Sequence, residues 1–202
     1  MNLLQDLKWR GLVYDIINEE ELEKRLEKEP ITLYCGFDPT ADSLHIGSLL
    51  PIVTLMRFHQ KGHKVIALTG GGTGLIGDPS GKKAERSLNE FETVVQWTNL
   101  FKEQLSRFIP FDDETAFIVD NFEWLKNITI IDLLRDYGKH FSVNLMLAKD
   151  SVKSRLDTGI TYSEFSYMVM QSIDFLQMYQ NPKLQCRMQI GGQDQWGNIT
   201  AG

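Results

Sequence analysis

A histidine and a glycine stand where the sequence predicts the start of a helix. Residues 35–48 read CGFDPTADSLHIGS, and apolar residues at helical spacing follow. Backbone N–H groups and the positive end of the helix dipole attract anions at such a point. His45 beside them suits a triphosphate, although a lone histidine there is more often a capping or surface residue. Gly47 would let a flat base approach the backbone, so this segment favours nucleotide binding.

A glycine-rich segment offers a second place for phosphates. The stretch GTGLIG, residues 72–77, fits the G-x-G-x-x-G pattern of dinucleotide-binding proteins and follows a predicted strand. Those glycines should open a helix, but the turn-forming residues DPSG come next, and GDPSGKK does not have the P-loop spacing. Two interpretations remain: a flexible loop without a function, or a basic loop whose Lys82, Lys83 and Arg86 close over phosphates.

Three polar residues share one face of an otherwise apolar predicted helix. Tyr167, Gln171 and Asp174 are spaced i, i+4 and i+7, which places them within an arc of roughly 60°. A helix that is apolar nearly all round is buried, so this stripe faces either solvent or a polar pocket. A phenol, an amide and a carboxylate in line would suit a small ligand with an amine or a hydroxyl group.

The elements that must position these residues alternate between strand and helix. The patterns predict strands at 31–37, 64–70, 116–121 and 184–192, and helices at 18–29, 48–61, 89–109, 130–137 and 161–180. Helix starts are signalled by Asn or Thr followed three residues later by Glu, at 18 and 21, 89 and 92, and 161 and 164. The alternation predicts an α/β fold with a parallel sheet and helices on both faces. Each strand ends in a polar or glycine-rich stretch, so a site is expected at that rim.

Size and composition fit a globular domain. The 202 residues suit one large domain, or one domain with a small insertion, and the hydrophobic share is 42%. No apolar run is long enough to cross a membrane, and two cysteines form no disulfide framework, so a cytoplasmic protein without a membrane partner is expected. The net charge of −6 argues against a general nucleic-acid coat but allows a local basic patch.

Five segments together resemble bacterial-type tyrosyl-tRNA synthetases, which are class I aminoacyl-tRNA synthetases. They are LYCGFDPTADSLHIG, GLIGDPSGKK, LRDYGKHFSVN, TYSEFSYMVMQSIDFL and QIGGQDQWGNITAG, in this order and over nearly the whole chain. The resemblance implies a Rossmann-like, doubly wound catalytic domain with a helical insertion. It also implies that L-tyrosine and ATP, with Mg²⁺ carried by the nucleotide, form tyrosyl-adenylate by in-line attack of the tyrosine carboxylate, and that the tyrosyl group then passes to tRNA(Tyr).

The resemblance also implies residue roles. For tyrosine, Tyr34 and Asp174 would bind the hydroxyl, and the ammonium group would be held by Asp78, Tyr167 and Gln171. The ATP site would comprise Cys35, Gly36, Asp38, Thr40, His45, Gly47, Ser48, Gly192 and Asp194. Catalysis would involve Thr40, His45, Lys82, Arg86 and Gln195, by positioning and charge stabilisation and without a resident metal.

Two positions depart from the family pattern. Ser48 stands where the motif usually ends in histidine, which should weaken a transition-state contact, and Gln193 replaces a serine and could crowd the ribose side. These departures leave open a non-catalytic relative that binds tyrosine or a nucleotide. A dinucleotide-dependent oxidoreductase is a third hypothesis, favoured only by GTGLIG.

The resemblance also divides the chain into parts. It predicts an N-terminal helical segment at about 1–30 and an insertion at about 122–160 that forms a homodimer interface and receives the tRNA acceptor end. The last residues, GGQDQWGNITAG, read like the middle of an element. In this family a second, lysine-rich signature loop and the tRNA-binding parts lie C-terminal to the region matched here. We therefore expect a catalytic-domain fragment that is impaired in activation.

Overall fold

The computed structural model describes residues 1–80 and 89–202 and contains a four-stranded parallel sheet. The strands are β1 (Thr32–Phe37), β2 (Lys64–Thr69), β3 (Ala116–Asp120) and β4 (Met188–Ile190), in the order β3-β2-β1-β4. The predicted α/β fold with a parallel sheet is confirmed. The fourth strand is shorter than predicted because Gln185 has a φ of 45° and Cys186 donates its N–H to the Met178 carbonyl, so this segment first packs on a helix.

Helices connect and cover these strands. They are α1 (Leu3–Trp9), α2 (Glu19–Lys28), α3 (Leu49–Gln60), α4 (Phe91–Leu105), α5 (Phe122–Leu125), α6 (Ile130–Asp132), α7 (Val143–Leu147), α8 (Asp150–Leu156), α9 (Tyr162–Gln180) and α10 (Trp196–Ile199). Short 3-10 turns cover Ile46–Ser48, Thr73–Leu75, Gly138–His140 and Gln193–Gln195. The helix predicted at 130–137 is α-helical only in α6 and continues as a π-turn over Leu133–Tyr137.

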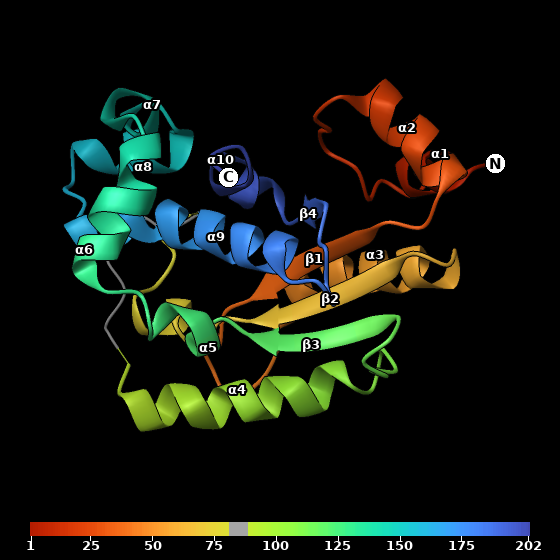
Figure 1. The fold of residues 1–202 in the computed structure, drawn as a ribbon, viewed down its shortest axis with the longest axis horizontal. Helices are drawn as coiled ribbons and strands as arrows, with labels where there is room; N and C mark the ends of the chain where they lie inside the picture. The colour runs from red at the N-terminus through yellow and green to blue at the C-terminus, as the bar shows by residue number, and fades with distance from the viewer. Residues whose placement is uncertain (81–88) are drawn as a thin grey trace.

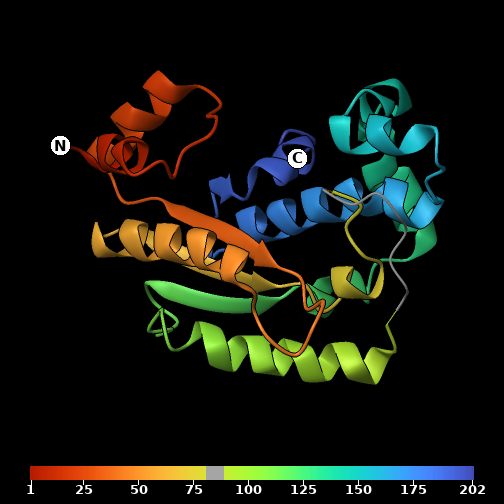
Figure 2. The same cartoon turned by 180° about the vertical axis from the view of Figure 1, so that it is seen from behind.

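The sheet lies between two layers of helices (Figures 1 and 2). Successive side chains of a strand point to opposite faces, so β1 contributes to both layers. Leu33, Cys35 and Phe37 pack with residues of α3 and α4, whereas Tyr34 packs in the cluster that contains Met178 of α9. Tyr34 therefore lies on the face that α9 covers, which is the face of the predicted polar stripe.

The predicted helix caps are only partly correct. The Thr161 hydroxyl accepts from the Glu164 N–H at the start of α9, as predicted, but the Glu164 carboxylate does not return this bond. It forms a buried ion pair with Arg155 instead, at 2.8 and 2.9 Å, because α8 packs there. Asn18 is in the left-handed conformation and makes no cap bond, and α4 begins after Glu90, one residue later than the predicted cap at Asn89.

Three consecutive glycines after β2 let neighbouring groups approach the backbone closely. A Cβ atom at Gly70 would lie 1.9 Å from Asp38 Oδ1, and one at Gly71 would lie 2.3 Å from Asp120 Oδ1. Any side chain here would displace carboxylates at the ends of β1 and β3. The next residues form the short turn Thr73–Leu75 and not the start of a long helix, which removes the basis of the dinucleotide fingerprint.

Most of the remaining helices lie at the two ends of the molecule, beyond the sheet and the helices that cover it (Figure 1). Helices α1 and α2 lie at the opposite end of the molecule from α6–α8 (Figure 1), and α5–α8 occupy the region predicted as an insertion. Among the described residues, no helix has the length and apolar character needed to cross a membrane.

Candidate active site

A cavity of about 460 Å³ lies at the carboxyl ends of β1 and β4. Strands β1, β2 and β3 lie side by side in chain order, whereas β4 pairs with the other edge of β1. The order of the strands therefore reverses between β1 and β4. In open α/β sheets, ligands bind in the crevice at this switch point. The cavity is therefore where the fold itself predicts a ligand.

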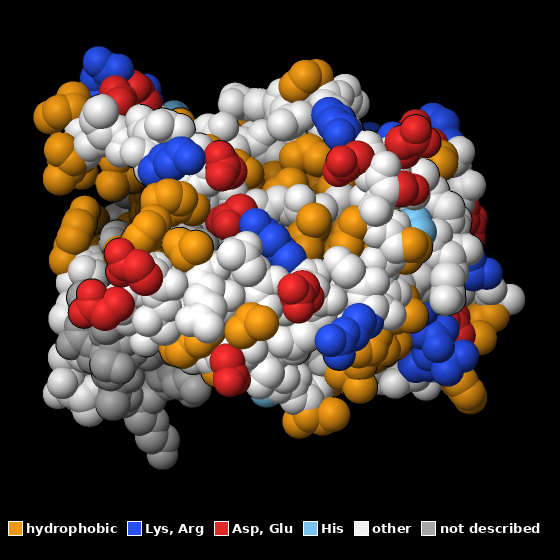
Figure 3. All heavy atoms as spheres, turned by 90° about the horizontal axis from the view of Figure 1, so that it is seen from below, with side chains coloured by type: hydrophobic (Ala, Val, Ile, Leu, Met, Phe, Trp, Pro, Cys, Tyr) orange, Lys and Arg blue, Asp and Glu red, His pale blue; other side chains and the backbone are white. Residues whose placement is uncertain are grey.

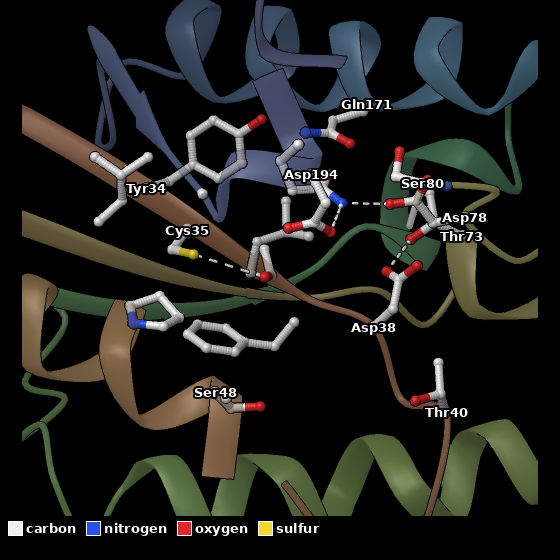
Figure 4. A pocket seen from close by; sticks show the side chains of 18 of the residues that line it. Tyr34, Cys35, Asp38, Thr40, Ser48, Thr73, Asp78, Ser80, Gln171 and Asp194 are labelled. Carbon is white, nitrogen blue, oxygen red and sulfur yellow. Dashed lines mark hydrogen bonds between the residues drawn. The ribbon is translucent and has the colours of Figure 1, made fainter. Parts of the chain in front are cut away.

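Most of the predicted site residues line this one cavity. They are Tyr34, Cys35, Gly36, Asp38, Thr40, His45, Gly47, Ser48, Asp78, Tyr167, Gln171, Asp174, Asp194 and Gln195. Gly192 is not among the lining residues, although the preceding Gly191 is. Lys82, Lys83 and Arg86 lie outside the described residues. In Figure 4, Tyr34 and Gln171 lie on one side of the pocket, and Thr40 and Ser48 lie on the opposite side.

The polar stripe of α9 faces this cavity and not solvent. Tyr167 and Asp174 are buried, and Gln171 is half-buried at the cavity wall. Tyr34 approaches from β1, packs against Phe175 with ring centroids 5.8 Å apart, and is 1% exposed. Its hydroxyl has no hydrogen-bond partner within the described part of the chain. A buried hydroxyl without a partner is costly, and a polar group of a ligand would remove this cost.

Asp174 is a buried carboxylate held by two neutral donors. Asn121 Nδ2 donates to its Oδ2 at 2.9 Å, and Trp124 Nε1 donates to its Oδ1 at 2.7 Å. Burial raises its pKa to about 7; the two hydrogen bonds oppose this, and the nearby charge of Asp38 adds to it. Each oxygen can accept a further bond, so Asp174 can receive the hydroxyl of a ligand.

Asp38 is joined by a hydrogen bond to the polar stripe of α9. Its Oδ2 accepts from the Tyr167 hydroxyl at 2.6 Å, and its Oδ1 accepts from Thr73 Oγ1 at 2.8 Å. Burial and the Asp38 charge raise the pKa of Tyr167 well above 10.0, so the phenol stays neutral. The resemblance assigns Asp38 to the ATP site; in the structure Asp38 lines the cavity, and its carboxylate accepts hydrogen bonds from Tyr167 and Thr73.

Asp78 connects the segment after β2 with the segment after β4. Gln195 Nε2 donates to Asp78 Oδ2 and, at 3.1 Å, to Asp194 Oδ2, as Figure 4 shows. Asn198 Nδ2 lies 3.4 Å from Asp78 Oδ1 and 3.2 Å from Gln195 Oε1. Asp78, predicted for the ammonium group, and Gln195, predicted for the reacting groups, therefore belong to one polar cluster.

The side of the cavity that contains His45 and Gly47 is more open, since both residues are exposed. His45 is exposed and precedes the turn Ile46–Ser48, and a Cβ atom at Gly47 would lie 2.9 Å from its ring. The space above Gly47 is thus next to the imidazole. Burial raises the pKa of the Cys35 thiol to about 12, so this group is neutral. Gln193 is exposed and does not line the cavity, so the crowding expected of its side chain is not found.

The sequence did not identify four of the polar residues that hold the site. Thr73, Asn121, Trp124 and Asn198 contact Asp38, Asp174 or Asp78. A signal existed for Asn121, which is the last residue of the strand predicted at 116–121 and belongs to the polar stretch at its end. No spacing rule pointed to Trp124, because its role depends on where α5 places one indole N–H.

This architecture is that of an α/β domain with a parallel sheet and a polar cavity at the switch point of that sheet. The family model described as "tRNA synthetases class I (W and Y)" matches residues 26–202, and the chain belongs to this family. The predicted family membership is confirmed.

The relatives agree with this assignment. The chain is 60% identical over 203 residues to a "Tyrosine--tRNA ligase" of Bacillus velezensis and 59% identical over 204 residues to one of Geobacillus stearothermophilus, covering 100% of this chain and 48% of each relative. It thus spans about half the length of these relatives. A C-terminally truncated mitochondrial tyrosyl-tRNA synthetase of Aspergillus nidulans superposes with a TM-score of 0.87 at 28% identity, over 98% of this chain and 58% of that one. An Archaeoglobus fulgidus tyrosyl-tRNA synthetase complexed with L-tyrosine has a TM-score of 0.72 at 21% identity, over 98% of this chain and 58% of that one, which indicates the shared fold.

Proposed function

We propose that this chain carries the tyrosine-activating site of a tyrosine--tRNA ligase. Such an enzyme joins L-tyrosine to ATP, releases pyrophosphate, and passes the tyrosyl group to tRNA(Tyr). The observation that carries the proposal is the pair formed by the unpartnered Tyr34 hydroxyl and the buried Asp174 carboxylate at the cavity wall. A phenol that enters between them donates to Asp174 and gives Tyr34 the partner it lacks.

The rest of the tyrosine molecule fits the neighbouring groups. Its ammonium group is received by Asp78, Tyr167 and Gln171, which line the same cavity and offer oxygen acceptors. Its carboxylate then points toward Gln195, on the side where β4 ends. This places the attacking oxygen between the amino-acid pocket and the nucleotide side.

ATP, with Mg²⁺ carried by the nucleotide, occupies the open side. Thr40 and His45 bind the phosphate end, Cys35, Asp194 and the backbone near Gly192 hold the ribose, and Lys82 and Arg86 close on the pyrophosphate. The carboxylate attacks the α-phosphorus in line and pyrophosphate leaves, without a covalent enzyme intermediate. Rate enhancement comes from positioning and from charge stabilisation of the leaving group.

A binding measurement on this chain tests the proposal. Residues 1–202 are expected to bind L-tyrosine in isothermal titration calorimetry but to support only weak tyrosine-dependent ATP–pyrophosphate exchange, because the family's lysine-rich signature loop is not within these residues. Gln180→Ala, an exposed change at the end of α9, is the matched control and should bind tyrosine normally. A folded chain that does not bind tyrosine would contradict the proposal, and a chain that exchanges at the rate of the full-length relatives would contradict the expected impairment of activation.

The departure at Ser48 gives a second test. Ser48 lines the cavity but reaches less far than a histidine, so Ser48→His in a protein of the relatives' full length should raise the adenylation rate. Tyrosine affinity should change little, because a contact made only in the transition state acts on turnover. Pre-steady-state rates of adenylate formation decide the matter. A variant no faster than its parent would argue against a lost contact, and no exchange in either protein would favour the non-catalytic relative.

The proposed partners include a second copy of the chain and tRNA(Tyr). Support comes from exposed apolar side chains in the insertion, namely Ile130, Ile131, Leu134 and Leu145, which are 53–71% exposed. In Figure 3, apolar side chains gather at the end of the molecule where α6 lies. Such a patch on an insertion suits a homodimer interface.

The proposed location is a reducing cytoplasm. Two buried free cysteines, Cys35 and Cys186, support this location.

A further inference from the structure

A continuous path of hydrogen bonds joins the two ends of the polar stripe on α9. Tyr167 donates to Asp38 Oδ2 at 2.6 Å, and Thr73 donates to Asp38 Oδ1 at 2.8 Å. Asn121 Nδ2 donates to Thr73 Oγ1 and to Asp174 Oδ2, each at 2.9 Å. Tyr167 and Asp174 are thus connected through three residues that do not belong to α9.

These three residues stand at the ends of three adjacent strands. Asp38 directly follows β1 and Asn121 directly follows β3, while Thr73 lies in the turn after β2, between them in the sheet. The strand ends are in register, since Phe37 pairs with Thr69 and Thr69 with Asp120. Tyr167 and Asp174 are about 10 Å apart along the helix axis, at about 1.5 Å per residue. The strand rim therefore bridges two turns of α9.

The directions of these bonds are fixed by one backbone contact. Asn121 Oδ1 accepts from the Gly72 N–H at 2.8 Å, so the amide nitrogen of Asn121 points to Thr73 and Asp174. The Thr73 oxygen receives this hydrogen and directs its own hydrogen to Asp38.

The hydroxyl of Tyr167, at the other end of the path, is also oriented by these bonds. Because Tyr167 also gives its hydrogen to Asp38, the Tyr167 oxygen keeps its lone pairs for another group. That orientation suits a substrate ammonium group, which can only donate.

We infer that Thr73 is a positioning residue that couples the two ends of the amino-acid pocket. This inference rests on the proposed binding of tyrosine. Within the path, Thr73 is the residue whose single hydroxyl both accepts and donates, and it is 1% exposed. A substrate hydroxyl that donates a hydrogen bond to Asp174 stabilises the orientations of Asn121 and Thr73. In these orientations, Asp38 and Tyr167 are positioned for the ammonium group. Each end of the substrate then binds more tightly when the other is present.

The coupling is measured with four ligands that form a thermodynamic cycle. L-Tyrosine has both groups, L-phenylalanine lacks the hydroxyl, 3-(4-hydroxyphenyl)propionate lacks the ammonium group, and 3-phenylpropionate lacks both. Dissociation constants for residues 1–202 come from calorimetry, or from ligand-observed NMR competition for the weak ligands. The effects of removing two groups joined in one hydrogen-bond network are non-additive. The fold-loss in affinity on removing both the hydroxyl and the ammonium group should therefore differ by about threefold or more from the product of the two single fold-losses.

Two variants at the same position separate coupling from packing. Thr73→Val keeps the shape but removes the hydroxyl, so the cycle should become additive to within the error of the measurement. Thr73→Ser keeps the hydroxyl and should retain the coupling, even if it binds tyrosine somewhat less tightly. A valine variant that keeps the wild-type coupling, or a serine variant that loses it as fully as valine, would overturn the inference.

The remaining outcomes also decide the question. If circular dichroism shows that Thr73→Val does not fold, Tyr167→Phe breaks the path at its other end and should lower the preference for tyrosine over phenylalanine by about twofold or more. An unchanged preference overturns the inference, as does an additive cycle in the unsubstituted chain. If that chain binds tyrosine, the proposed function stands whichever way the coupling falls; if it does not bind tyrosine, both fail.

Discussion

Replacing Asp174 by asparagine is expected to lower the preference for tyrosine over phenylalanine by orders of magnitude. The carboxylate is 3% exposed and accepts from Asn121 and Trp124, and its remaining acceptor sites face the cavity. A pocket built around a substrate hydroxyl rejects the analogue without it, because its buried polar groups then lack a partner; tyrosyl-tRNA synthetases are themselves the standard case of such rejection. Asparagine has the same size but brings an N–H₂ group to a site that already receives two donors.

Tyr34→Phe is the milder companion change. It removes one hydroxyl that has no partner within the described residues, so it should reduce discrimination by about 1 kcal/mol, the scale of one net hydrogen bond. The measurement is the ratio of kcat/KM for tyrosine and phenylalanine activation in a protein of the relatives' full length, with Gln180→Ala as the control on the same helix. If Asp174→Asn and Tyr34→Phe both leave this ratio unchanged, the phenol does not bind between these two residues.

The proposed tyrosine pocket was the part of the site that the sequence predicted best. The spacing of Tyr167, Gln171 and Asp174 depends only on helix geometry, and the apolar remainder of α9 fixed the choice between a buried and an exposed helix. What spacing could not decide was the direction of the stripe, because that depends on the side chains of β1 that α9 packs against. In the structure, Tyr34 of β1 packs in the same cluster as Met178 of α9 and lines the same cavity as the polar stripe. The stripe therefore faces the cavity.

The supporting residues were harder to predict for a physical reason. Thr73 and Asn121 act through contacts across strand ends, and such contacts depend on register, which the sequence of one strand does not specify. The glycine-rich stretch at 72–77 resembled a dinucleotide-binding loop because loops and close backbone packing favour the same residue. A Cβ atom at Gly72 would lie 2.8 Å from Leu125 Cδ1 and one at Gly74 would lie 3.1 Å from Pro39 Cδ, so close packing accounts for these two glycines.

The predicted caps were only partly correct, on similar grounds. A capping box is recognised from two residues, but Glu164 has a stronger partner in Arg155, which is brought close only by α8. A charge-assisted bidentate pair is stronger than a bond to a backbone N–H. The packing of α8 thus removes the Glu164 side chain from the cap, and a rule based on neighbouring residues cannot predict such a contact.

Tyrosine binding to residues 1–202 is expected to weaken as the pH falls below 7. Burial, opposed by bonds from Asn121 and Trp124 and supported by the charges of Asp38 and Asp120, raises the pKa of Asp174 to about 7 from its ordinary value of 3.8. A substrate phenol donates to the ionised carboxylate, so binding favours the ionised form. Below the pKa, a proton must be released on binding, and the dissociation constant should rise by up to about tenfold per pH unit.

Stability should follow the opposite trend, and this distinguishes Asp174 from other titrating groups. Because its folded pKa lies above the unfolded value, the folded state binds the proton more tightly. The stabilisation is therefore full below about pH 4 and is lost as the pH rises toward 7, on the linkage relation for one group. Calorimetric titrations from pH 5.5 to 8, in buffers of different ionisation enthalpy, measure the affinity and the released proton, and urea unfolding measures the stability. Asp174→Asn should remove both slopes; slopes that persist in this variant would assign them to another group.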